Sequence, residues 1–192
     1  MNTIRRNILP LLALMAVFVI SAPVSLADPR TPGSAVNYQQ LVKKIRKELV
    51  TLPYYGVFDN LAFEINGDTV TLYGQVVRPS TKSDAEHRVA RLSGVTRVIN
   101  RITVLPLSSF DDSIRLRTYR ELVRTGSLYR YFQGANPSIH IVVDRGRVTL
   151  EGVVANTMDA QLAYMAARRV PGSFAVTNHL AIEERAPRRV AV

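Results

Sequence analysis

The sequence contains no cysteine and no tryptophan among its 192 residues. The absence of cysteine excludes disulfide bonds, thiolate metal ligands, a thiol nucleophile and the acylated cysteine of a lipoprotein. Acidic residues are also few, 15 against 25 lysines and arginines, so the formal net charge at pH 7 is +10. A charge of this sign favours a partner with an anionic surface, either nucleic acid or lipid. The hydrophobic share of 47% and the charged share of 21% are typical of a folded globular protein.

The N-terminus has the layout of a secretory signal peptide. Arg5 and Arg6 precede an apolar run at residues 8–20, which is shorter than the roughly 20 residues of a membrane-spanning helix. Small residues precede an expected cleavage point after Ala27. We therefore expect residues 1–27 to be a signal peptide, although an uncleaved N-terminal anchor stays open as an alternative. The expected location is the periplasm, and nucleic acid is not expected as a partner there.

A stretch of the sequence occurs twice, 78 residues apart. VTLYGQV at residues 70–76 recurs as VTLEGVV at residues 148–154, and other residues match at the same offset without a gap. The matched pairs include Gly74 with Gly152, Gly94 with Gly172, Asn100 with Asn178, and Arg46 with Arg124. Self-similarity at a fixed offset indicates a duplicated structural unit. Two homologous units of about 70 to 75 residues are predicted, close to the lower size limit of an independent domain.

The first unit is predicted to consist of a helix, two strands, a second helix and a third strand. The expected ranges are 36–49 for the first helix, 61–65 and 70–76 for a hairpin, 80–93 for the second helix and 98–104 for the third strand. Helical and alternating spacing of apolar residues distinguish the helices from the strands. Asn66 and Gly67 predict a tight hairpin turn. Ser80 is expected to cap the second helix at its N-terminus, and Gly94 is expected to end it.

The second unit is predicted to repeat this order. The expected ranges are 114–124 and 158–170 for helices, and 139–143, 147–154 and 175–182 for strands, with Thr157 as the cap of the later helix. A helix connects the second and third strands of each unit, so these strands can pair in parallel through a right-handed crossover, whereas the hairpin is antiparallel. The predicted fold class is α+β. Each unit is expected to be a three-stranded mixed sheet with two helices packed on one face.

These features resemble the BON domain, present twice. The resemblance rests on the αββαβ order, the V-T-L-x-G-x-V strand, the helix that ends in glycine and the V-x-N-x-[IL]-x-[VI] strand after it. Tandem BON domains behind a signal peptide are typical of osmotically inducible periplasmic proteins and of an outer-membrane lipoprotein that binds anionic phospholipid. This chain differs from the lipoprotein because no cysteine follows its signal. The implied organisation is a signal peptide at 1–27, a linker at 28–35, BON domains at 36–106 and 109–184, and a basic tail at 185–192.

Residues that match between the two units are interpreted as structural. They are Gly74, Gly152, Gly94, Gly172, Asn100 and Asn178. The first glycine pair lies in a strand and the second at a helix end, where close backbone approach and positive φ angles favour glycine. The asparagines lie in the apolar row of the last strand, so their amides are expected to bond to neighbouring backbone.

No catalytic or metal-binding constellation is found in the sequence. No acidic residue of the first unit matches an acidic residue of the second, and the three histidines are scattered. Acid–base catalysis and metal binding both need several such groups at defined geometry. Phosphate-binding glycine motifs and the nucleophile elbow are also absent from the sequence. We therefore expect a non-enzymatic protein without a cofactor or a metal.

The first helix of each unit carries basic side chains on one face. These candidate lipid-binding residues are Lys43, Arg46 and Lys47 in the first unit, and Arg117, Arg120 and Arg124 in the second. Aromatic residues follow both helices, and a basic helix followed by aromatic rings is typical of binding to anionic lipid. In the lipoprotein relatives the lipid contact lies on the first helix of the second BON domain, which implies this role for the three arginines and Tyr129. The alternative is that these faces are merely solvated and the aromatic rings pack in the core.

The predicted function is binding to anionic phospholipid surfaces by an exported protein that supports envelope integrity under osmotic stress. An alternative is a protein-interaction module, in which sheet edges or the open sheet face dock an envelope protein or a second copy of the chain, because edge strands offer unpaired backbone groups. A third class, an enzyme or small-ligand protein, would require a deep polar pocket with convergent charged residues.

Overall fold

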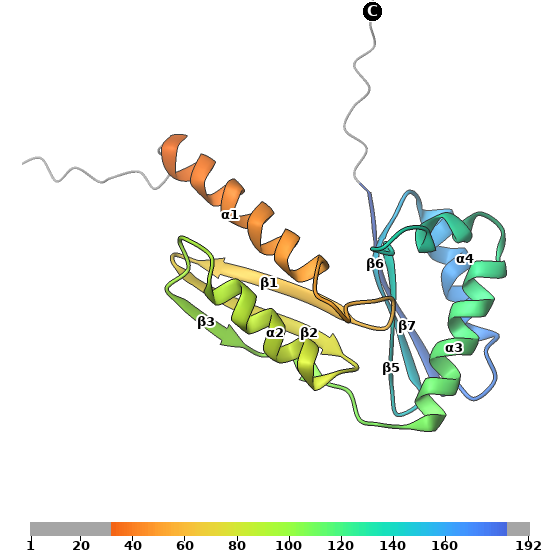
Figure 1. Ribbon diagram of the computed structural model, residues 1–192. Coiled ribbons are helices and arrows are strands. Elements are labelled where there is room, and N and C mark those ends of the chain that lie inside the picture. The colour runs from red at the N-terminus through yellow and green to blue at the C-terminus, as the bar shows by residue number, and fades with distance from the viewer. Residues whose placement is uncertain (1–31, 184–192) are drawn as a thin grey trace, which may run out of the picture.

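Two helix-and-sheet units make up residues 32–183, the part of the chain that the computed structural model describes (Figure 1). The first unit contains α1 (Pro32–Val50), β1 (Asn60–Asn66), β2 (Thr69–Val76), α2 (Pro79–Ala90), β3 (Arg97–Asn100) and β4 (Thr103–Val104). The second unit contains α3 (Ser109–Arg124), the 3-10 helix η1 (Gly126–Phe132), β5 (Ile139–Asp144), β6 (Arg147–Val154), α4 (Thr157–Arg168) and β7 (Ala175–Ile182). The predicted signal peptide and basic tail lie outside the described residues. None of the helices within residues 32–183 has the length and apolar character needed to cross a membrane.

Each unit has a mixed sheet, as the sequence predicts. β1 pairs with β2 in antiparallel orientation, and β2 pairs in parallel with β3 and β4. In the second unit β5 and β6 are antiparallel, and β6 and β7 are parallel. The two hairpins also share their register, because Phe63 lies opposite Leu72 just as Ile141 lies opposite Leu150. The α+β fold class with two equivalent units is confirmed.

Four details of the predicted elements are wrong. The α2 helix ends at Ala90 with Arg91 as its C-cap, four residues before Gly94, which was expected to end it. The third strand of the first unit is divided into β3 and β4 after Asn100, whose side chain accepts the backbone N–H of Ile102 at 3.1 Å. The α2 helix begins at Pro79, not with Ser80 as its cap, since a proline in the first turn lacks the N–H that a cap would satisfy. The cap of α4 is Asn156, whose side chain accepts the N–H of Asp159, and Thr157 is already helical.

The two units have separate hydrophobic cores. The core of the first unit joins α1, α2 and the sheet through fully buried side chains such as Ile45, Leu72 and Val89. The core of the second unit is larger because η1 adds Leu128, Tyr131 and Phe132 to it. This 3-10 helix has no counterpart among the predicted elements. A core in each unit is what a duplicated domain requires, because each sheet must bury one face.

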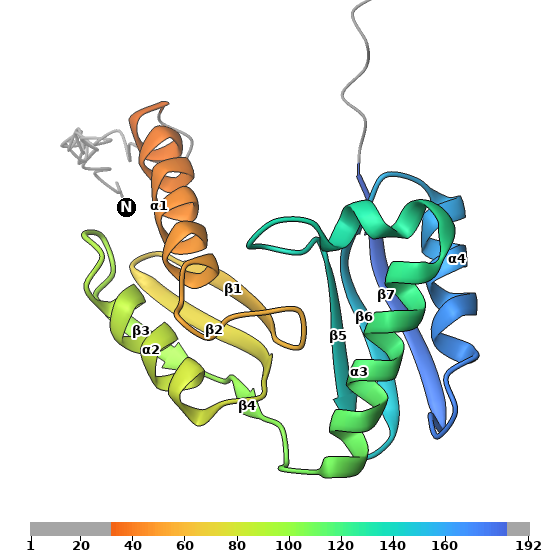
Figure 2. The ribbon, with the colours of Figure 1, turned by 45° about the vertical axis from the view of Figure 1, so that its right-hand side comes forward.

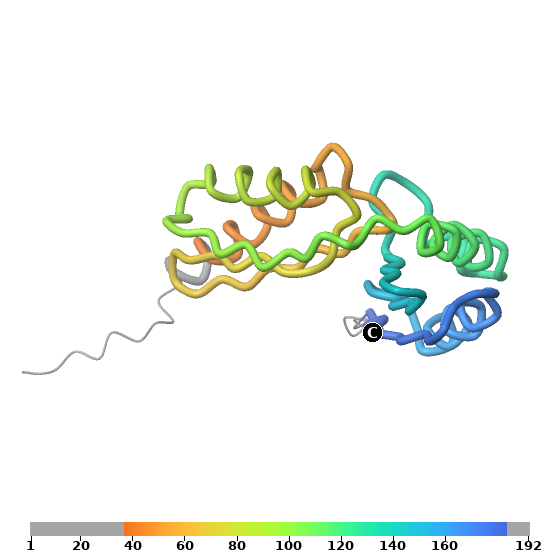
Figure 3. Tube along the Cα trace, turned by 90° about the horizontal axis from the view of Figure 1, so that it is seen from below, coloured from red at the N-terminus to blue at the C-terminus, as the bar shows by residue number. Residues whose placement is uncertain are grey.

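The units lie side by side and touch through the loop between α1 and β1 (Figures 2 and 3). In this loop the carbonyl of Val57 accepts the N–H of Ile141 in β5 at 2.7 Å. The side chains of Val57 and Phe58 pack against the core of the second unit, where Phe58 meets the ring of Tyr119 edge-on at 6.3 Å between centroids. The first unit therefore supplies apolar side chains to the core of the second.

Candidate functional site

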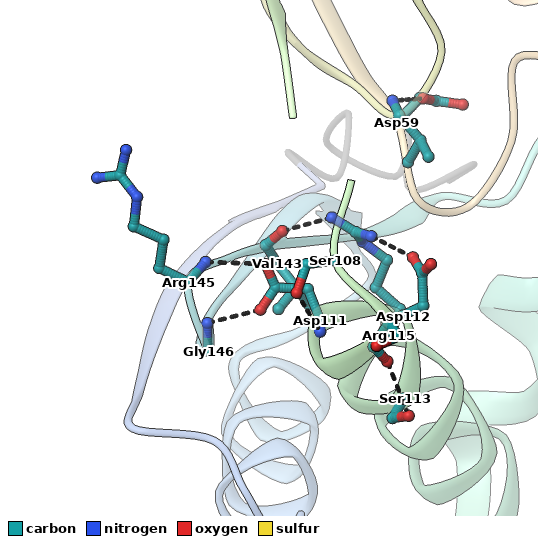
Figure 4. A network of polar contacts seen from close by, with 11 residues as sticks. Asp59, Ser108, Asp111, Asp112, Ser113, Arg115, Val143, Arg145 and Gly146 are labelled. Carbon is teal, nitrogen blue, oxygen red and sulfur yellow. Dashed lines mark hydrogen bonds and ion pairs between the residues drawn. The ribbon is translucent and has the colours of Figure 1, made fainter. Parts of the chain in front are cut away.

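Polar contacts fix the first turn of α3, the helix that carries the three candidate arginines of the second unit (Figure 4). Ser108 caps the helix by accepting the N–H of Asp111 at 3.1 Å. The buried carboxylate of Asp111 in turn accepts the backbone N–H groups of Arg145 and Gly146 at 3.0 and 2.8 Å. These two residues form the β5–β6 turn, and both have positive φ angles. The carboxylate therefore couples the start of α3 to the hairpin beneath it.

Arg115 is a basic residue of α3 that does not belong to the exposed surface. It is 2% exposed, forms an ion pair with Asp112 and donates from Nη2 to the carbonyl of Val143 at 2.7 Å. Both contacts of this guanidinium lie within the second unit, and the bond to Val143 helps to hold α3 against β5 (Figure 4). The exposed cations of α3 are consequently those on its other faces.

Four arginine side chains meet in a shallow hollow where α3 lies beside the end of α4. The hollow is lined by Arg117, Arg120, Glu121, Arg124, Arg169, Val170 and Pro171 and has a volume of about 330 Å³. We call it the arginine hollow. Arg117 donates to the carbonyl of Pro171 at 3.3 Å, which ties α3 to the segment after α4. Glu121 is the one acidic side chain in its lining, so the hollow carries a clear excess of positive charge.

The first unit does not repeat this arrangement. At the offset of 78 residues, Arg117 and Arg120 correspond to Gln39 and Val42. The common fold therefore does not need arginine at these two positions. Arg169, which the sequence analysis did not select as a site residue, corresponds to Arg91. The arginine matched at this position in both units could have indicated a site residue in the sequence. Its closeness to α3, however, depends on how α3 and α4 pack.

The aromatic residues after α3 divide between the core and the surface. Tyr131 and Phe132 are 7% and 8% exposed, whereas Tyr129 is 55% exposed. The hydroxyl of Tyr131 donates to Asp159 at 2.6 Å, and Asp159 also forms an ion pair with Arg130. Burial by itself would raise the pKa of Asp159, but the hydrogen bonds from Tyr131 and Ser127 and the Arg130 charge hold it below its ordinary value. Tyr129 is therefore the ring of this group that an external surface can reach.

The basic side chains of α1 lie elsewhere. Lys43, Arg46 and Lys47 are exposed. Arg46 lines a groove between α1, β1 and the second unit, on the side of the second sheet away from α3 and α4 (Figure 1). The structure thus brings Arg117, Arg120 and Arg124 together with Arg169, and it does not bring Arg46 to them.

The residues interpreted as structural have short-range partners. An added Cβ at Gly74 or Gly152 would lie 2.0 Å from the carbonyl oxygen of the neighbouring strand, and Gly94 and Gly172 have φ angles of 97° and 90°. The two asparagines make equivalent bonds to the backbone. Asn100 donates to the carbonyl of Lys82 and Asn178 to that of Ala160, both at 3.0 Å.

Ionisable side chains also gather at the contact between the units. His140 is buried, and its ring nitrogens lie 3.3 Å from the Tyr55 hydroxyl and from the Gly56 carbonyl. Burial lowers the pKa of His140, raises that of Asp59, and raises that of Tyr55 to about 12. A protonated Tyr55 donates to Nε2, so Nδ1 carries the proton that reaches Gly56. Within residues 32–183, no three histidine or acidic side chains are grouped so that they could hold a metal ion.

The family model of the BON domain matches the chain twice, at residues 39–106 and 111–184. The chain is a tandem BON-domain protein. Both matches coincide with the two helix-and-sheet units, and the arginine hollow lies on the second BON domain. Among curated proteins, no sequence matches this BON protein.

Seven solved chains are similar to this BON protein, two of which come from one protein. Both are of CdsD, described as a structural protein of the type III secretion system of Chlamydia trachomatis, and the second is its C-terminal domain. The first is 14% identical with a TM-score of 0.30, and the match covers 74% of this chain and 92% of the other. The second is 14% identical with a TM-score of 0.27, and covers 74% and 96%.

Proposed function

We propose that this tandem BON-domain protein is exported to the periplasm and binds anionic phospholipid surfaces reversibly through the arginine hollow. Its role is non-enzymatic and supports the integrity of the envelope under osmotic stress. The observation that carries this proposal is the convergence of Arg117, Arg120, Arg124 and Arg169 on one hollow that contains a single acidic side chain. Guanidinium groups suit phosphate because they donate paired hydrogen bonds to its oxygens.

The strength of binding follows from the number of exposed cations. Each basic residue near an anionic leaflet contributes about 1 kcal/mol, so the four arginines together supply about 4 kcal/mol. This amount gives weak, reversible docking, and salt screens it. Tyr129 adds an exposed amphipathic ring on η1, the segment directly after α3.

Vesicle co-sedimentation tests the mechanism. We expect the protein to sediment with vesicles that contain phosphatidylglycerol but not with pure phosphatidylcholine vesicles, and binding should fall as salt rises. Changing Arg117, Arg120 and Arg124 together to glutamate should weaken binding by roughly 100-fold or more, because about 3 kcal/mol of attraction is lost. Equal binding to the two kinds of vesicle at low salt would refute the electrostatic mechanism.

A matched control separates the place of the charges from their number. Arg91, Arg97 and Arg101 are exposed on the first unit. Changing these three to glutamate alters the net charge by the same amount as the change in the hollow. The control variant should keep most of the binding, because the hollow is intact. If both triple variants lose binding equally, only the total charge matters and the hollow is not the site.

The periplasmic location is tested separately. The full chain with a C-terminal tag should appear in the periplasmic fraction of a Gram-negative host at the size of a chain cleaved after Ala27. If the protein stays in the cytoplasm, the proposal that it is exported is refuted. The outcome of the vesicle co-sedimentation experiment does not depend on this result.

A further inference from the structure

The first strands of the two hairpins differ in how well their core-facing side chains are covered. In β5 these side chains are Ile139, Ile141 and Val143, and all three are fully buried. In β1 the matching side chains are Leu61, Phe63 and Ile65, and all three are only partly buried. The sequence positions and the register are equivalent, so the difference comes from what lies over each strand.

In the second unit a turn from outside the unit, residues 56–59, lies against the edge of β5. The carbonyl of Val57 accepts the N–H of Ile141, and the partly buried side chains of Val57 and Phe58 pack against the core. Phe58 also contacts Tyr119, so the segment touches both β5 and α3. The turn shares two features with β-strand addition, a backbone bond to a sheet edge and apolar side chains that pack beside that edge.

In the first unit the corresponding place is an open groove. Its lining includes Val42, Arg46 and Leu49 from α1 and Leu61 and Phe63 from β1, and its volume is about 600 Å³. The second unit closes one end of the groove with side chains of β5 and β6. β1 is an edge strand, and within residues 32–183 no other segment pairs along its free edge.

We propose that this groove, which we call the α1–β1 groove, binds an extended segment of a partner protein that adds as a strand to the edge of β1. Phe63 has the register of Ile141, so its N–H points to the free edge as that of Ile141 does. The partner segment carries two neighbouring apolar side chains, as Val57 and Phe58 do, to cover Leu61 and Phe63.

The basic side chains of α1 indicate which charge the partner segment carries. Arg46 lines the groove, and no acidic side chain among the described residues forms an ion pair with it. Lys43 and Lys47 lie exposed on the same helix. A carboxylate next to the apolar pair complements these cations. The proposal does not depend on lipid binding, because the arginine hollow lies on the other side of the second sheet.

The test uses the chain from residue 28 onward and the synthetic peptide YYGVFDN, which is the sequence of residues 54–60. Amide exchange measured by NMR should show the N–H of Phe63 slowed by about tenfold or more in the presence of excess peptide, since a new hydrogen bond protects it. A peptide in which Val-Phe is replaced by Ser-Ser should leave this exchange unchanged. No protection of Phe63, or protection of Ile141 in its place, overturns the proposal.

Variants on α1 locate the binding site. Val42→Glu places a carboxylate in the groove and should abolish peptide binding. Arg46→Glu should weaken it by about fivefold or more, while Lys44→Glu, with the same change in charge outside the groove lining, should leave it unchanged. Both groove variants should retain vesicle binding, and the triple arginine variant should retain peptide binding. Equal effects of Arg46→Glu and Lys44→Glu overturn the assignment of the carboxylate to Arg46.

Two other occupants would be recognised in the same experiments. If the chain's own tail fills the groove, Phe63 is protected in the free protein and loses protection when residues 184–192 are deleted. If a second copy fills it, protection of Phe63 rises with protein concentration together with dimerisation. Either result overturns the proposal of a separate partner protein.

Discussion

Replacing Gly152 by alanine should destabilise the protein by about 2–3 kcal/mol. Two costs add at this position. A side chain at a positive φ angle, here 120°, costs about 1–2 kcal/mol. In addition, the new Cβ would lie 2.0 Å from the carbonyl oxygen of Ser138, and to reach even 3.0 Å the strands must separate by about 1 Å. That movement disrupts the bond from the N–H of Val153 to the same carbonyl, which is worth about 1 kcal/mol.

Gly172→Ala is the matched control for this change. Gly172 also has a positive φ angle, 90°, but an added Cβ would meet the ring of Phe110 at 3.6 Å and Ile114 at 3.8 Å, both ordinary contacts. The control should therefore lose about 1–2 kcal/mol, from backbone strain alone. Urea unfolding followed by circular dichroism measures both variants. The reasoning is refuted if Gly152→Ala loses no more stability than Gly172→Ala. Gly74→Ala should behave like Gly152→Ala, because its added Cβ would lie equally close to the carbonyl of Asn60.

Three further predictions concern the second unit. Phe58→Ala should lower the stability of the second unit by about 2 kcal/mol although the residue belongs to the first unit, and differential scanning calorimetry should then resolve the transitions of the two units. Burial lowers the pKa of His140 below 6.5, so the unfolded chain takes up the proton first as the pH falls. The stability of the protein should therefore decrease as the pH falls through and below 6.5. Between about pH 7 and about pH 5, urea titrations should show a smaller loss of stability for the His140→Gln variant. Asp111→Ala should cost about 2–3 kcal/mol in chemical unfolding, because two buried N–H groups of the β5–β6 turn lose their acceptor; a loss below about 0.5 kcal/mol would contradict this role.

The duplication made most of the fold predictable from the sequence. A repeat at a fixed offset aligns the two units, so weak signals in one copy are supported by the other. The hairpins at Val70 and Val148 were placed in this way, whereas the helices end at Ala90 and Arg168, four residues before Gly94 and Gly172. The caps were predicted less well, because the choice between neighbours such as Asn156 and Thr157 depends on local backbone geometry that spacing does not report.

The candidate site was only partly predictable. Helical spacing places Arg117, Arg120 and Arg124 on neighbouring faces of α3, and that much follows from the sequence. Arg169 joins them only because α4 ends beside α3, and Arg115 is not among them because it turns inward to the carbonyl of Val143 in β5. Both facts depend on how α3 packs against other elements, which the pattern of a single helix does not contain.

The loop that carries Val57 and Phe58 limits what can be learned by dissecting this chain. A fragment that begins at α3 lacks two side chains that pack against its core and the carbonyl that bonds to the edge of β5. Such a fragment would expose apolar surface and an unpaired strand edge, both of which promote aggregation. We therefore expect the C-terminal BON domain to be less stable as a separate fragment than in the full chain, and during synthesis it gains this contact from a segment that has already left the ribosome.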